Sequence, residues 1–129
     1  MDIIRTIHAF FGERLLPLLI VLAAIWFVAT WKPDTRPNLV ARLFPVLVDI
    51  QVALGLIYFI YGLVTGAAAR FLAFPFILHP IIGLLAAGVA HSTVRPRGRV
   101  ARLGRWAPLV PLALLLVMVI GNVMLGRAV

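Results

Sequence analysis

Long apolar runs separated by short polar segments dominate the chain. A run of about 20 mostly apolar residues can cross the hydrocarbon core of a membrane as a helix. Four such runs lie at about residues 12–31, 39–64, 71–91 and 106–125. Short connections favour antiparallel neighbours. The pattern therefore predicts an all-α protein, a single domain over residues 1–129 that forms an up-down-up-down four-helix bundle in a membrane.

The first apolar run also resembles a signal peptide and must be distinguished from one. It is longer than the roughly 7–15 residues of a signal-peptide core, and no small-x-small cleavage site follows it. We therefore expect it to be a retained anchor.

Composition agrees with membrane embedding. Hydrophobic residues make up 64% of the 129 and charged residues only 12%, whereas soluble domains have about 45–50% and about 25%. A soluble domain of this size cannot bury so much apolar surface, and disorder requires low hydrophobicity with high charge. The absence of cysteine excludes disulfides, thiolate metal sites and iron–sulfur clusters.

The net charge of +8 is mainly a signal of orientation. Eight of the 12 cations follow the first and third runs: Lys32, Arg36, Arg42, Arg95, Arg97, Arg99, Arg102 and Arg105. The other four are Arg5, Arg14, Arg70 and Arg127. The positive-inside rule then predicts cytoplasmic basic loops and both termini outside, as in a bacterial inner membrane. We expect the basic run 95–105 to attract anionic lipid; without interleaved aromatic residues it does not suggest nucleic-acid binding.

Two histidines are candidate ligands of one cofactor. His79 lies about eight residues into the third run, at a depth of roughly 12 Å. His8 reaches a similar depth if the first helix begins near Ile3. The first and third runs are parallel in the predicted bundle, so the two imidazoles could hold the iron of a haem b from opposite sides. Two alternatives remain: a hydrogen bond from His79 to a neighbouring helix, and an interfacial amphipathic helix over residues 2–11 with His8 at its polar edge.

Asp49 is an acidic residue about ten positions inside the second run. We expect a structural partner such as Arg42, Arg102, Arg105 or His91; the alternative is a carboxylate of a proton relay or a quinone site.

Gln51 lies about 200° around the helix from Asp49 and shares a face with Gly55 and Tyr58, which favours a helix–helix contact. His91 is about 18 Å along the helix from His79, too far to bind the same metal, and is expected at the interface beside the basic loop.

Glu13 and Arg14 adjoin near the outer interface, where an ion pair is expected. Arg14 is also a candidate to bind a haem propionate or an acidic lipid head.

The chain has no glycine-rich phosphate loop, no His-Glu-x-x-His motif and no carboxylate pair, so nothing indicates hydrolytic or transferase catalysis.

Three short stretches resemble a group of small bacterial four-helix membrane proteins described as cytochrome-b-like. They are the His-x-x-x-Gly-x-Arg pattern at residues 8–14, the Ile-Gln followed by Leu-Gly-Leu at residues 50–56, and the His-Pro at residues 79–80. The resemblance implies a haem b with His8 and His79 as its ligands. The group has a histidine where this chain has Asp49.

Three functions are compatible with these observations. The first is an accessory or anchor subunit of a larger respiratory or photosynthetic electron-transfer complex, which suits a chain with so little mass outside the membrane. The second is an electron-transfer protein that binds haem b through His8 and His79. The third is a small proton-conducting channel that uses Asp49.

Overall fold

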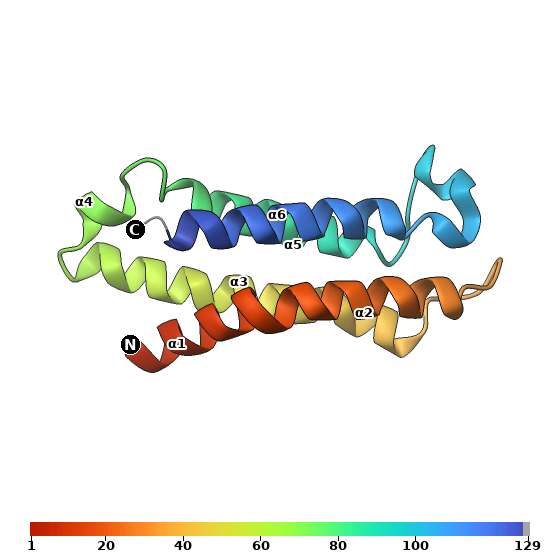
Figure 1. Cartoon of the computed structure of the whole chain (residues 1–129), viewed down its shortest axis with the longest axis horizontal. Helices are drawn as coiled ribbons and strands as arrows, with labels where there is room; N and C mark the ends of the chain where they lie inside the picture. Colours follow the sequence, from red (N-terminus) through yellow and green to blue (C-terminus); the bar gives the residue numbers. More distant parts are fainter. Residues whose placement is uncertain (128–129) are drawn as a thin grey trace.

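The computed structural model describes residues 1–127, and every regular element in this part of the chain is helical. In order they are α1 (Asp2–Phe10), the π-helical turn η1 (Phe11–Leu15), α2 (Leu16–Ala29), α3 (Leu39–Val64), α4 (Ala68–Phe71), α5 (Leu78–Ser92), the 3-10 helix η2 (Val100–Trp106) and α6 (Leu109–Arg127). The long helices lie side by side along the long axis of the molecule (Figure 1). The prediction of an all-α protein is confirmed.

The first helix begins at Asp2, which agrees with the alternative start near Ile3 and not with a start near residue 12. The backbone stays helical through Phe11 and Leu16, and the whole stretch Asp2–Ala29 is long and apolar enough to cross a membrane. No proline occurs before Pro17, and α1 packs against α3. Residues 2–10 are therefore continuous with the helix that follows and do not form a helix separate from it.

The third run differs most from its prediction, because its helix begins at Leu78 rather than near residue 71. Residues 68–71 form the short α4, and non-helical turns follow. Pro75 lacks an amide hydrogen and disfavours a helical conformation of Phe74, so the chain turns before the helix starts. The 15 residues of α5 span about 22 Å, less than the roughly 30 Å of a hydrocarbon core.

Three helical stretches are thus long and apolar enough to cross a membrane, namely Asp2–Ala29, Leu39–Val64 and Leu109–Arg127, with α5 a shorter apolar helix. The last begins at Leu109 rather than near residue 106. The preceding basic segment, expected to be a loop, is partly folded as η2, which is interrupted where Gly104 adopts φ 58°.

The core is a narrow stripe on each helix. In α2 the buried residues are Leu16, Ile20, Ala23 and Phe27, a spacing of four, three and four positions. That spacing keeps one face of a helix toward its neighbours. Leu112, Leu115 and Val119 repeat the pattern in α6, and the small Ala86 and Ala90 of α5 allow close packing. α5 packs against both α3 and α6, and α2 packs against α6.

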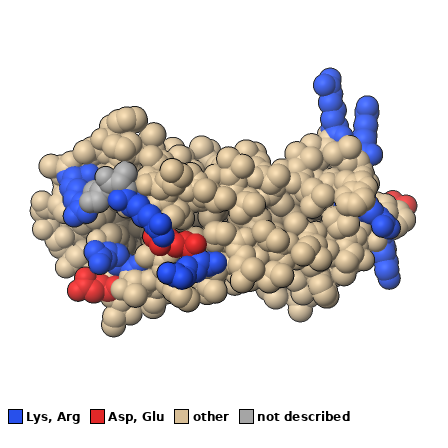
Figure 2. All heavy atoms as spheres, viewed as in Figure 1, with Lys and Arg blue, Asp and Glu red and all other residues tan. Residues whose placement is uncertain are grey.

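Most large apolar side chains outside this stripe are exposed, on all the long helices. On the face shown in Figure 2, the charged side chains gather toward the two ends of the molecule, with a broad uncharged zone between them. A helix that is apolar all round is typical of a membrane span.

Candidate functional site

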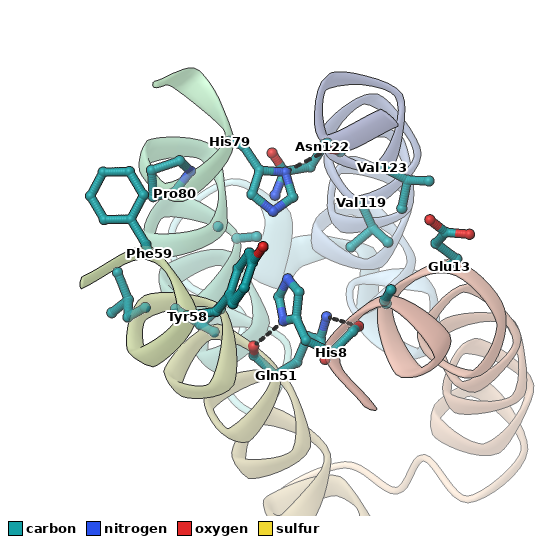
Figure 3. Close-up of a pocket in the computed structure, with 18 of the residues that line it drawn as sticks. His8, Glu13, Gln51, Tyr58, Phe59, His79, Pro80, Val119, Asn122 and Val123 are labelled. Atoms are coloured by element: carbon teal, nitrogen blue, oxygen red, sulfur yellow. Dashed lines mark hydrogen bonds between the residues drawn. The ribbon is translucent and has the colours of Figure 1, made fainter. Parts of the chain in front are cut away.

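A cavity of about 330 Å³ lies between α1, α3, α5 and α6, near the end of the molecule where the described chain begins and ends. Its walls are mostly apolar, with Leu56, Phe59, Phe76 and Val119 among the lining residues. Figure 3 shows His8 and His79 reaching toward one another across it from two different helices. The volume falls at the lower end of the range of about 300–1,000 Å³ for ligand pockets.

The two histidines lie side by side, which is one of the alternatives drawn from the sequence, and His79 also forms the hydrogen bond to a neighbouring helix that is the other. Their ring centres are 5.9 Å apart and the ring planes are at 81°. His8 comes from α1 and His79 from the first turn of α5. The Phe76 ring stacks on the His79 ring at 5.7 Å and 12°, which limits rotation of that imidazole. The His79 ring is therefore held in place by its surroundings.

Hydrogen bonds determine which ring nitrogen of each histidine is free. Nδ1 of His8 lies 3.0 Å from the carbonyl oxygen of Gln51, and Nδ1 of His79 lies 2.9 Å from that of Asn122. A carbonyl oxygen only accepts, so each Nδ1 carries the proton and donates it. In a neutral imidazole Nε2 then carries a lone pair. The two Nε2 atoms face each other in Figure 3.

Two facing lone pairs repel unless a cation or a proton lies between them. Bonds from a metal ion to imidazole nitrogen are about 2.0–2.1 Å, so two rings on opposite sides of one metal ion have centres about 6.4 Å apart. The observed 5.9 Å is close to that separation and slightly shorter. A backbone acceptor on the other ring nitrogen is also the usual support of a metal-binding histidine. His8 and His79 could therefore hold a metal ion whose remaining ligands a cofactor would supply.

The protein itself supplies no further ligands, since no group of three or more His, Cys, Asp or Glu side chains in residues 1–127 could hold a metal ion. A bare ion would have two protein ligands here. A porphyrin would contribute the four remaining nitrogens, and the chemistry of the donor set thus favours a haem over a free metal ion.

Glycines make the room that the imidazoles occupy. A Cβ atom at Gly55 would lie 2.6 Å from Cε1 of His8, and one at Gly126 would lie 3.1 Å from Cε1 of His79. Each histidine therefore packs directly on the backbone of the helix opposite its own, and any larger residue there would push the ring aside.

Gln51 of α3 forms two hydrogen bonds with His8 of α1, one as acceptor and one as donor. Its carbonyl accepts from His8, and its Nε2 donates to the carbonyl of His8 at 2.8 Å. A Cβ at Gly12 would lie 2.5 Å from that Nε2, so the amide needs the glycine in the π-helical turn. Such turns often occur at functional sites.

Two buried acceptor atoms in the described part of the chain have no hydrogen-bond partner, Oε1 of Gln51 and Oδ1 of Asn122. Both residues line the cavity. A buried unpaired acceptor costs about 1–3 kcal/mol, so these atoms indicate a cavity that holds water or a ligand with polar groups.

Arg14, the predicted partner of a propionate, does not line the cavity and is exposed. It follows Gly12 by two positions, about 200° around a helix, which turns it away from the cavity. Arg5 and Arg70 line the cavity instead. Glu13 forms its ion pair with Arg127 of α6 rather than with the adjacent Arg14.

Asp49 and His91 form a separate pair, in which Oδ2 and Nε2 are 2.8 Å apart. Their side chains are 43% and 56% exposed, and neither lines the histidine cavity. Of the predicted partners of Asp49, His91 is the one that contacts it. Gln51, two positions along α3, is buried, so the two side chains leave the helix on different sides.

The sequence analysis did not assign the roles of Asn122 and Gly126, and it expected Gly55 in a helix–helix contact without identifying His8 as its neighbour. The signal for Asn122 is a polar residue within the apolar run 106–125. Gly126 carries no such signal, because a helical glycine facing a side chain looks the same in sequence as one facing lipid.

No protein-family model, curated protein or solved structure matches this chain. The resemblance to cytochrome-b-like proteins gains no support from these comparisons. A function for the cavity must therefore be argued from its geometry.

Proposed function

We propose that this chain is an integral membrane protein of four spans, α5 included, that binds one b-type haem between His8 and His79 and carries electrons. The facing imidazoles, with ring centres 5.9 Å apart and both Nδ1 atoms bonded to backbone carbonyls, carry the proposal. They favour haem binding over a cofactor-free accessory subunit.

A haem held there would supply reversible one-electron oxidation and reduction of its iron. The residues of this chain would determine which molecules reach that iron and which atoms hold it. If His8 and His79 both held the haem, neither oxygen nor a substrate would bind its iron, which favours electron transfer over oxygen chemistry. The carbonyls of Gln51 and Asn122 keep both Nδ1 atoms protonated and so keep both Nε2 atoms available as ligands.

The walls of the cavity also suit a bound haem. Phe59, Phe76 and Val119 provide an apolar surface for the macrocycle and limit access of water, which is one of the ways a protein tunes a redox potential. Arg5 and Arg70 line the same cavity, and their positive charge complements the carboxylates that a b-type haem carries.

The proton-channel alternative has less support. A proton path needs a continuous series of polar groups inside the protein, whereas Asp49 is partly exposed and bonds to His91, which is also partly exposed.

Haem binding can be tested with the full chain purified in detergent and titrated with haem. We expect one haem per chain, a reduced-minus-oxidised difference spectrum of the bis-imidazole type, and its loss in His8→Ala and in His79→Ala. His91→Ala is the matched control, since it removes the third histidine, which lies outside the cavity. A spectrum unaffected by the first two substitutions, or no stoichiometric binding to a folded chain, would overturn the proposal.

A further inference from the structure

A second cavity lies at the other end of the molecule, between the ends of the long helices. Its volume is about 780 Å³, and it is formed by the end of α2, the segment 30–38, the start of α3, residues 93–96 and η2. The histidine site does not use it. Its lining residues include Trp26, Trp31, Lys32 and Arg36.

The floor of this second cavity is well packed. Phe27, Ala41, Thr93 and Ala107 line it, and each is buried. The rim is held in shape by Asn38, whose Oδ1 accepts from Nε1 of Trp26 and from the amide of Ala41. The cavity is thus apolar at its base and polar at its edge.

Charge around the second cavity is strongly positive. Lys32 and Arg36 line it, and neither forms an ion pair with a carboxylate in residues 1–127. The nearby segment 93–106 adds five arginines. Asp34 is the single acidic residue in the sequence of segments 30–38 and 93–106. Figure 2 shows these long basic side chains projecting at this end of the molecule.

We propose that the second cavity binds the phosphate headgroup of an anionic phospholipid, with Lys32 and Arg36 as its cationic contacts. This rests on the membrane embedding proposed above but not on haem binding. Tryptophan and cationic side chains are typical of the membrane–water interface, and basic pockets between the ends of membrane helices bind acidic lipid heads. The apolar floor would contact the start of the acyl chains, which a free phosphate ion lacks.

Tryptophan fluorescence can test this, because the three tryptophans of the chain, Trp26, Trp31 and Trp106, lie in or next to the segments that form the cavity. The full chain in an uncharged detergent is titrated with phosphatidylglycerol or phosphatidylcholine that carries brominated acyl chains, which quench nearby tryptophans. We expect phosphatidylglycerol to quench at about 25-fold lower mole fraction, because each of the two cationic contacts contributes about fivefold.

The variant Lys32→Gln/Arg36→Gln should lose this preference, by about fivefold for each cation removed. The matched control is Arg97→Gln/Arg99→Gln, which removes the same charge from residues that do not line the cavity and should retain most of it. Far-UV circular dichroism checks that both variants remain helical.

Equal quenching by the two lipids, or equal losses in the two double variants, would overturn the lipid site and indicate only diffuse charge attraction. Reversal by inorganic phosphate at a concentration matched to the lipid would also overturn it, in favour of a simple anion site. The haem spectrum of the same preparation reports separately on the histidine site, so the failure of one proposal is distinguishable from the failure of the other.

Discussion

At the scale of single residues, the histidine site depends on what lies behind each imidazole. Two backbone carbonyls select the ring nitrogen that is free, and two glycines leave space for the rings. None of these four contacts involves a charged side chain. The placement of the two imidazoles is therefore sensitive to small changes of volume.

Gly55→Ala should displace His8, because the new methyl group would lie 2.6 Å from Cε1 of the ring. We expect haem affinity to fall by about 10–100-fold, as for other losses of support behind a metal ligand. Absorbance titration with haem measures this.

Gly88→Ala is the control for the glycine substitution, since a Cβ at Gly88 in α5 would have nothing within 4 Å. It should bind haem as the unaltered chain does. Equal losses in the two variants would mean that the packing of Gly55 on His8 is irrelevant to binding.

Gln51→Leu should destabilise the folded chain by about 1–3 kcal/mol, because it leaves the His8 carbonyl without the Nε2 donor. Asp49→Asn, two positions away on a partly exposed pair, should cost less than about 1 kcal/mol. Unfolding in mixed micelles, followed by circular dichroism, compares the two. A larger loss of unfolding free energy for Asp49→Asn than for Gln51→Leu would mean that the Asp49–His91 pair stabilises α3 more than the Gln51–His8 contact does.

At the scale of elements, the junction η1 between α1 and α2 changes which neighbour the first helix contacts. α1 packs against α3, whereas α2 packs mainly against α6. The π-helical turn shifts the register of one half relative to the other, and Gly12 in that turn accommodates Gln51. This junction brings His8 to the cavity while the α2 stripe remains in the core.

The connection from α2 to α3 is a second such junction, and it depends on Asn38. The side chain of Asn38 caps α3 by accepting from the amide of Ala41, and it also bonds to Trp26 and Thr30. Asn38→Ala should lower the free energy of unfolding by about 0.5–2 kcal/mol. Asn38→Asp keeps a capping oxygen and should recover most of that loss in the same unfolding measurement; no difference between the two would mean that the cap contributes little.

At the scale of the whole molecule, the distribution of cations separates the two ends. The basic segments 30–38 and 93–106 lie at one end, and the histidine cavity with Arg5 and Arg70 lies at the other. If the larger group of cations is cytoplasmic, the histidine site faces the outer leaflet, and its electron partner should be reached from that side.

Single-cysteine labelling tests this orientation, because the chain has no cysteine of its own. Ala69→Cys and Ala101→Cys introduce exposed thiols near opposite ends of the molecule. In intact spheroplasts a membrane-impermeant thiol reagent should label the cysteine at position 69 and reach that at position 101 only after lysis. The reverse pattern would invert the proposed orientation.

The length and spacing of apolar residues were enough to predict an all-helical chain and the three helices of membrane length in its described part, since these properties depend on local composition. The predicted starts near residue 12 for the first run and near residue 71 for the third were wrong, whereas the alternative start near Ile3 agrees with α1. The first was placed too late because the amphipathic stretch 2–11 is less apolar than the rest, although it has no helix breaker. The second was placed too early because apolar residues 72–77 look like helix, although Pro75 turns the chain there.

For the site, the sequence by itself identified His8 and His79, because an imidazole in an apolar run requires a partner. Only the tertiary structure decided that the two face each other, that Asn122 and Gln51 hold them, and that Arg5 and Arg70 rather than Arg14 line the cavity. Contacts such as that of His8 with Gln51 join residues 43 positions apart. They depend on the rotation of each helix about its axis, which is set by packing against neighbours and not by local sequence.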